Sequence, residues 1–81
     1  MSERATVTGA SWAQIGTGPA VVQLISTGTP VMLVDQTASP SGNDGVILTD
    51  AGDSLTFTRA QAIWALAVNP TASAVVAVQP G

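Results

Sequence analysis

The side chains that could perform acid–base or metal chemistry in this 81-residue chain are few. They are five carboxylates and two guanidinium groups: Glu3, Arg4, Asp35, Asp44, Asp50, Asp53 and Arg59. The sequence contains no His, Cys, Lys or Tyr. The chain therefore lacks the side chains that usually transfer protons near neutral pH. A Ser or Thr nucleophile would have no His or Lys to activate it. We predict that the chain is not an enzyme and has neither a catalytic residue nor a cofactor; only a site shared between subunits would leave room for catalysis.

Three aspartates, Asp44, Asp50 and Asp53, are the candidates for a calcium site, because calcium prefers clustered carboxylate and carbonyl oxygens. Their spacing does not match an EF-hand loop, and Asp in turn sequence commonly bonds its own backbone. Zinc and redox metals would lack His and Cys ligands. We therefore predict no metal site. Asp35 and Arg59 could form an ion pair, which contributes little where it is exposed.

Two tryptophans, Trp12 and Trp64, could stack on sugar rings. A Trp lies more often in a core or an interface, where it buries a large apolar area. Six residues are our candidate core or interface anchors: Trp12, Val21, Ile25, Trp64, Val76 and Val78.

Charged residues make up 9% of the chain and the net charge is −3, while 46% of residues are hydrophobic. Because nucleic-acid binding depends on basic side chains, we expect no nucleic-acid partner. Soluble monomers usually carry about 25% charged residues. The chain must therefore rely on hydroxyls and amides for solubility or cover much of its surface by association. Area scaling predicts about 4,500 Å² of folded surface from about 11,700 Å² unfolded, which is modest burial for a chain without disulfides. We expect a homo-oligomer.

Two long stretches, 5–34 and 60–81, carry no charge. Gly and Pro interrupt both of them, so neither predicts a membrane span, and we expect no membrane partner. The residues from Met1 to Arg4 do not resemble the start of a secretory signal. Synthesis in the cytoplasm is the expectation.

Turn residues recur about every seven to twelve positions, which is typical of an all-β sandwich or barrel. We predict a small single-domain β-sandwich or barrel, jelly-roll-like, over residues 10–81, preceded by an N-terminal arm over residues 1–9. The expected strands are seven short segments: Trp12–Ile15, Ala20–Ser26, Val31–Asp35, Val46–Thr49, Leu55–Thr58, Ile63–Val68 and Ser73–Gln79. If Val22 and Leu24 face the core, Val21 and Ile25 face outward. The segment from Gln36 to Gly45 is the longest expected loop.

The segment from Thr58 to Val68 also permits a helix, because it is Ala-rich and its apolar residues fit helical spacing. We favour a short turn over 59–62 followed by a strand. In that strand Trp64, Leu66 and Val68 share one face, and Ile63, Ala65 and Ala67 share the other.

The order of features resembles a group of small bacteriophage virion proteins encoded among head and tail genes. The similarity covers nearly the whole chain and depends on these segments: Ser11-Trp12, Gly18-Pro19-Ala20-Val21-Val22-Gln23, Pro30-Val31-Met32-Leu33-Val34, Ser39-Pro40, Gly45-Val46-Ile47-Leu48, Gly52-Asp53-Ser54, Ile63-Trp64-Ala65 and Val75-Val76-Ala77-Val78. The resemblance implies a β-sandwich structural subunit, often trimeric, that decorates capsids or builds tail and fibre parts. It implies no catalytic residues.

The leading functional hypothesis is therefore a virion structural protein: a capsid decoration or stabilising subunit bound to the outer surface of the head as a homotrimer. Its partners would be the major capsid protein or another virion protein, with the N-terminal arm lying on a neighbour. One alternative is a tail, baseplate or fibre component. Another is a glycan-binding module for host-surface attachment, which an exposed aromatic cluster would favour. In the leading hypothesis, removal of residues 1–9 would weaken docking and leave the folded core intact.

Overall fold

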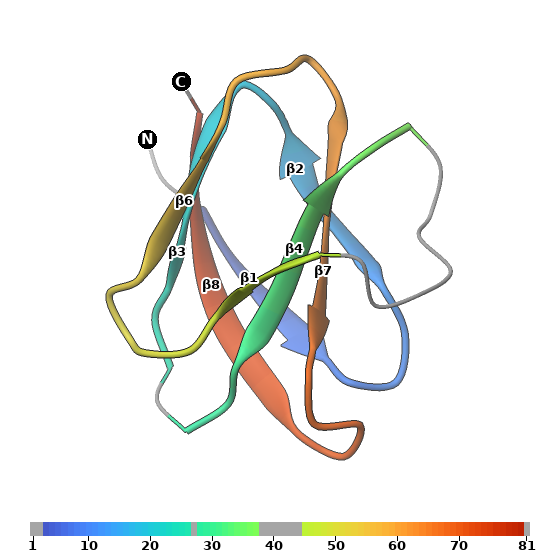
Figure 1. Cartoon of the computed structure of the whole chain (residues 1–81), viewed down its shortest axis with the longest axis vertical. Helices are drawn as coiled ribbons and strands as arrows, with labels where there is room; N and C mark the ends of the chain where they lie inside the picture. Colours follow the sequence, from blue (N-terminus) through green and yellow to red (C-terminus); the bar gives the residue numbers. More distant parts are fainter. Residues whose placement is uncertain (1–2, 27, 38–44, 81) are drawn as a thin grey trace.

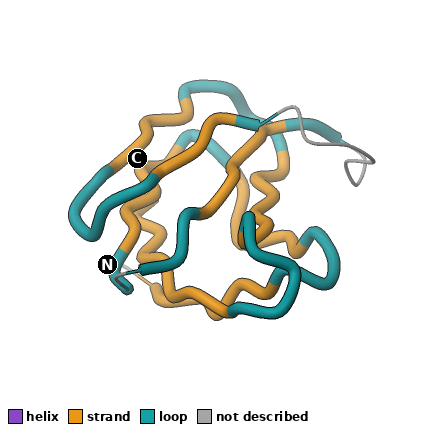
Figure 2. Tube along the Cα trace, turned by 60° about the horizontal axis from the view of Figure 1, so that its bottom comes forward, coloured by secondary structure: helices purple, strands orange, loops and turns teal. Residues whose placement is uncertain are grey.

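The computed structural model describes residues 3–26, 28–37 and 45–80 of the chain. Within those ranges the backbone consists of strands, turns and loops, without a helix (Figure 2). No helix long and apolar enough to cross a membrane occurs in the described part of the chain. Eight strands follow in order: β1 (Glu3–Thr8), β2 (Ala13–Thr17), β3 (Ala20–Leu24), β4 (Val31–Asp35), β5 (Val46–Leu48), β6 (Ser54–Phe57), β7 (Ala62–Ala67) and β8 (Ser73–Pro80). The all-β prediction is confirmed.

The strands form two four-stranded antiparallel sheets, ordered β1-β8-β3-β6 and β2-β7-β4-β5 (Figure 1). The pairings are nested: β4 pairs with β5, β3 with β6, β2 with β7 and β1 with β8. The chain is thus one long hairpin folded over on itself, and the further pairs β3–β8 and β4–β7 close the two sheets. This order is the jelly roll, in which two Greek keys form a double-layered sandwich. The jelly-roll-like sandwich predicted from the sequence is therefore the observed fold.

The first strand corrects the expected N-terminal arm. Residues 3–8 form β1, which pairs with β8 along its whole length, from Glu3 opposite Val78 to Thr8 opposite Ser73. Val7 is completely buried, and Ala5 packs against the core. Because these two side chains alternate with polar ones, β1 has the period-2 pattern of a half-buried strand. The described residues therefore form eight strands, one more than the sequence indicated, and the first of them begins before Trp12.

The core lies between the sheets and is built from alternate residues of each strand. Val22 and Leu24 of β3 are fully buried, which is the orientation that leaves Val21 on the outer side. In β7 the buried residues are Ile63, Ala65 and Ala67, so the short turn after β6 is followed by a strand, and the helical alternative is wrong. The seven expected strands agree with β2 to β8 to within two residues at each end. Every buried side chain in the described ranges is apolar.

Strand β2 has an irregular register with β7 at the point where β2 lies close to Val78 of β8. The register with β7 shifts between Gln14 and Gly16, which marks a β-bulge. A Cβ atom at Gly16 would lie 3.1 Å from Cγ1 of Val78, so glycine gives β8 room to pack there. The exposed surface of the folded chain is 4456 Å², which matches the value of about 4,500 Å² expected for a compact chain of this mass.

Candidate functional site

One sheet carries a contiguous apolar surface on the side away from the core. We call it the apolar face and define it by the outward-facing residues of β4, β5 and β7 together with the residue after β7: Met32, Val34, Ile47, Trp64, Leu66 and Val68. The register places Met32 between Ile47 and Leu66, and Val34 opposite Trp64. Ile47 in β5 is 49% exposed and Val68, just after β7, is 43% exposed. Met32 is only 4% exposed, so the more exposed members of the face, above all Ile47 and Val68, can contribute burial to a contact. None of the six residues has an ionisable group.

Strand β5 lies at the edge of the same sheet. It has β4 as its neighbour on one side, and no other described strand pairs with it. Val46, whose side chain lies on the other side of the strand from Ile47, is 54% exposed. Soluble proteins commonly protect edge strands with charge, proline or bulges, because unpaired main-chain groups there invite another strand. The sequence Val46-Ile47-Leu48 carries none of the protective side chains, so the β5 edge is suited to pairing with a partner strand.

Trp64 is held in place on the apolar face. Its indole Nε1 donates a 3.0 Å hydrogen bond to the carbonyl oxygen of Gln36, just beyond the end of β4, and the ring is partly buried. Trp12, before β2, is partly buried as well. Both tryptophans are thus partly buried, and Trp64 has its polar atom engaged.

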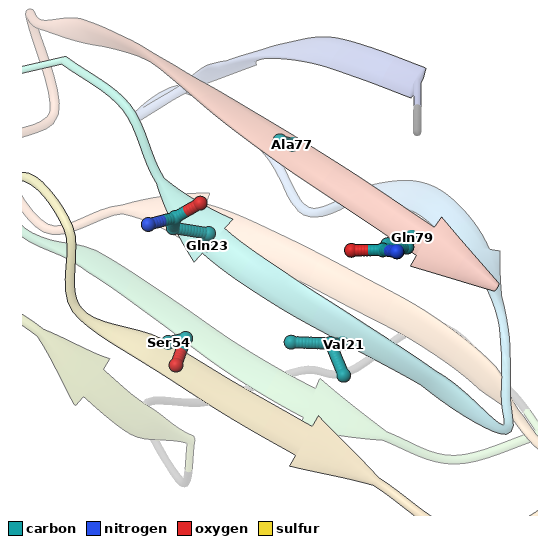
Figure 3. A pocket seen from close by; sticks show the side chains of 5 residues that line it. All are labelled: Val21, Gln23, Ser54, Ala77 and Gln79. Atoms are coloured by element: carbon teal, nitrogen blue, oxygen red, sulfur yellow. The ribbon is translucent and has the colours of Figure 1, made fainter. Parts of the chain in front are cut away.

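The opposite sheet presents a contrasting surface. We call the outer side of β1-β8-β3-β6 the polar face; its exposed residues are Arg4, Thr6, Thr8, Gln23, Ser54, Thr56, Ser73 and Gln79. A shallow hollow of about 230 Å³ lies on it, lined by Val21, Gln23, Ser54, Ala77 and Gln79 (Figure 3). The register puts Gln23 between Ser54 and Ala77, and Val21 beside Gln79. The hollow exists because Ala77 is small where the flanking residues of β3 and β8 are larger.

The six sequence-predicted anchors do not come together in one place. Val76 and Val78 lie in the core, with exposures of 0% and 6%. Val21 lines the hollow on the polar face, and Ile25 is partly buried just after β3, where its N–H donates to the carbonyl oxygen of Val75 at 2.9 Å. Trp64 belongs to the apolar face. The other five residues of that face were not singled out, because β4 is apolar on both sides and its sequence does not show which side faces out.

The Asp53 carboxylate has a structural role. Oδ2 of Asp53 accepts hydrogen bonds from the backbone N–H groups of Asp50 at 3.0 Å and Thr49 at 3.3 Å. It thereby closes the turn between β5 and β6, as Asp often does in turns. Asp44, the third residue of the calcium hypothesis, lies outside the described residues. No cluster of three potential metal-ligating side chains occurs within the described ranges.

Asp35 and Arg59 form the ion pair that the sequence suggested. Arg59 Nε lies 3.1 Å from Asp35 Oδ2, and Arg59 Nη2 donates to the backbone carbonyl oxygen of Asp35 at 3.0 Å. The Arg59 side chain is 63% exposed, so solvent screens the pair and its contribution to stability is small. The pair ties the end of β4 to the β6–β7 turn, next to Val34 in the sequence.

We expect the substitution Asp53→Ala to lower the free energy of unfolding by roughly 1 kcal/mol, because two backbone donors lose their acceptor. Asp50→Ala is the matched control, since the backbone N–H that Asp50 contributes is retained by alanine. Urea unfolding followed by tryptophan fluorescence measures both variants. Equal losses in the two variants would contradict the assigned role of the Asp53 carboxylate.

Comparison with known proteins adds no relative: no protein-family model, no curated protein and no solved structure matches this chain.

Proposed function

We propose that the chain is a bacteriophage virion structural protein, a decoration subunit that binds the outer surface of the head as a trimer and stabilises it. The observation that carries the proposal is the apolar face with the adjoining β5 edge, where Val46, Ile47 and Val68 are 43–54% exposed. Exposed apolar surface of this kind marks contact with another protein more often than it marks chemistry. The jelly roll occurs in viral capsid domains, but the same fold has many functions, so the proposal depends on the surface.

The two faces would have different roles in such a subunit. The apolar face and the β5 edge would lie against virion proteins, where side-chain burial and main-chain pairing supply the binding energy. The polar face, with its Thr, Ser and Gln side chains, would remain in water. Because the contact residues carry no charge, attachment should persist at high ionic strength, where screening weakens only charge–charge contacts. The closely packed core between the sheets makes the subunit a rigid clamp across neighbouring capsid proteins.

The docking test uses one substitution on each face. We expect Ile47→Lys to reduce the amount of protein bound to purified phage heads at least about tenfold, because a lysine would be buried against an apolar partner. Thr56→Lys, at an exposed position on the polar face, adds the same charge and should bind like the wild type. Both variants should keep the unfolding temperature of the wild type, since both positions are exposed. Equal binding by the two variants would show that the β5 side is not the contact.

The role in the particle is tested separately. Quantitative mass spectrometry of particles from the phage that encodes the chain should find it in the head fraction, in fixed proportion to the major capsid protein. Heads that lack it should release DNA at a lower temperature than complete heads. Release at the same temperature would overturn the stabilising role. Recovery of the chain only with purified tails would replace the head assignment by a tail, baseplate or fibre position.

A further inference from the structure

The hollow on the polar face is not used by the proposed function. It lies on the broad side of its sheet, across β3, β6 and β8, and both β3 and β8 have a neighbouring strand on each side. A ligand there cannot bind by adding a strand, so it must be recognised by side chains. The lining offers two primary amides, from Gln23 and Gln79, and one hydroxyl, from Ser54 (Figure 3).

The chemistry of these groups restricts the ligand. Each amide provides two N–H donors and one carbonyl acceptor, and the Ser54 hydroxyl provides both functions. Gln23 uses part of this capacity in a long 3.4 Å contact from Nε2 to the carbonyl oxygen of Gly52. None of the lining residues is ionisable, and Arg4, the register partner of Ala77 on β1, does not line the hollow. The matching ligand is therefore uncharged and rich in groups that both donate and accept hydrogen bonds.

The apolar lining residues and the size of the hollow restrict the choice of ligand further. The methyl groups of Val21 and Ala77 lie between the polar groups and form an apolar floor. A volume of about 230 Å³ is below the roughly 300–1,000 Å³ of drug-sized sites, so it accepts one small ring. A sugar ring has this combination, with apolar C–H groups on its face and hydroxyls around its rim. We propose that the hollow binds a single ring of a neutral saccharide.

The affinity should be low. The lining contains no aromatic ring on which a sugar could stack, and the hollow is open to solvent. A dissociation constant in the millimolar range, equivalent to about −4 kcal/mol, is the expectation for one ring. Several copies on one particle would raise the effective affinity by binding one polysaccharide at several points. This inference does not depend on where in a particle the chain is located.

The test is a titration of the isotope-labelled full-length protein followed by NMR. The probes are the methyl glycosides of glucose, galactose, mannose and N-acetylglucosamine, with glycerol as the control polyol. We expect at least one glycoside to shift the side-chain amide resonances of both Gln23 and Gln79, with one shared dissociation constant. Glycerol should leave them in place at equal concentration. Unmoved amide resonances with all four glycosides, or equal shifts with glycerol, would overturn the proposal.

Two variants separate the hollow from the rest of the face. Ala77 is partly buried on the outer side of β8. Ala77→Leu would fill the hollow and should raise the dissociation constant for the saccharide at least about fivefold, because the leucine side chain would occupy the space of the ring. Thr6→Leu places the same side chain on β1, outside the lining, and should bind like the wild type. The backbone spectrum of each variant reports folding independently of binding. Unchanged affinity in a folded Ala77→Leu variant would refute the assigned site. Docking to phage heads is a separate measurement, so either proposal can fail alone.

Discussion

Removing residues 1–8 is expected to leave the chain unable to fold, although a sequence-based interpretation treats this segment as a dispensable arm. The deletion removes β1, which pairs with β8 over six residues. Burial of a valine side chain contributes about 1.5–3 kcal/mol, and Val7 is fully buried. The deletion also uncovers one side of β8, from which Val76 and Val78 enter the core. These losses together approach the roughly 5–15 kcal/mol of net stability that a small domain has.

The measurement is thermal unfolding of the full-length and truncated chains, followed by near-ultraviolet circular dichroism. The control is Thr6→Ser combined with Thr8→Ser, which changes two exposed side chains of β1 and keeps the strand. This control should unfold cooperatively, close to the temperature of the wild type. A truncated chain that also unfolds cooperatively near that temperature would show that β1 is not part of the folding unit.

The second large effect is expected within β7. Ile63→Ala should lower the free energy of unfolding by roughly 2–5 kcal/mol, because it leaves a cavity at a completely buried position. Leu66→Ala, on the same strand but facing outward and partly exposed, should cost less than about 1.5 kcal/mol. Denaturant unfolding of both variants determines the difference. If Leu66→Ala proved the more damaging, the assignment of the two faces of β7 would be reversed.

Some of the fold could be predicted because the sequence repeats with the period of a strand. In β3, buried Ala20, Val22 and Leu24 alternate with Val21 and Gln23, so the strand itself could be predicted, although its apolar outer residues left the inward side conditional. The same alternation is present in β1, where Ala5 and Val7 are separated by polar residues. It was overlooked because charged residues begin the segment and small polar residues follow, a composition that also suits an extended arm.

The candidate surfaces were less predictable, for a physical reason. In β4 the consecutive residues Val31, Met32 and Leu33 are all buried, so alternation cannot show that Met32 lies on the side away from the core. The hollow depends on register: Val21 and Gln79 are far apart in sequence and become neighbours through the pairing of β3 with β8. Sequence periodicity shows which way a residue faces, but it does not show which residue of another strand will lie beside it.

The pairing of the first and last strands also determines how the molecule bears tension. Because β1 and β8 are antiparallel, Glu3 and Val78 are partners, and the two ends of the chain leave from the same end of the molecule (Figure 1). A pulling force on the two ends would break the hydrogen-bonded pairs between β1 and β8 one after another, as in opening a zipper. It would not shear all of these pairs at once. Mechanical load is therefore better borne across the broad faces than through the chain ends.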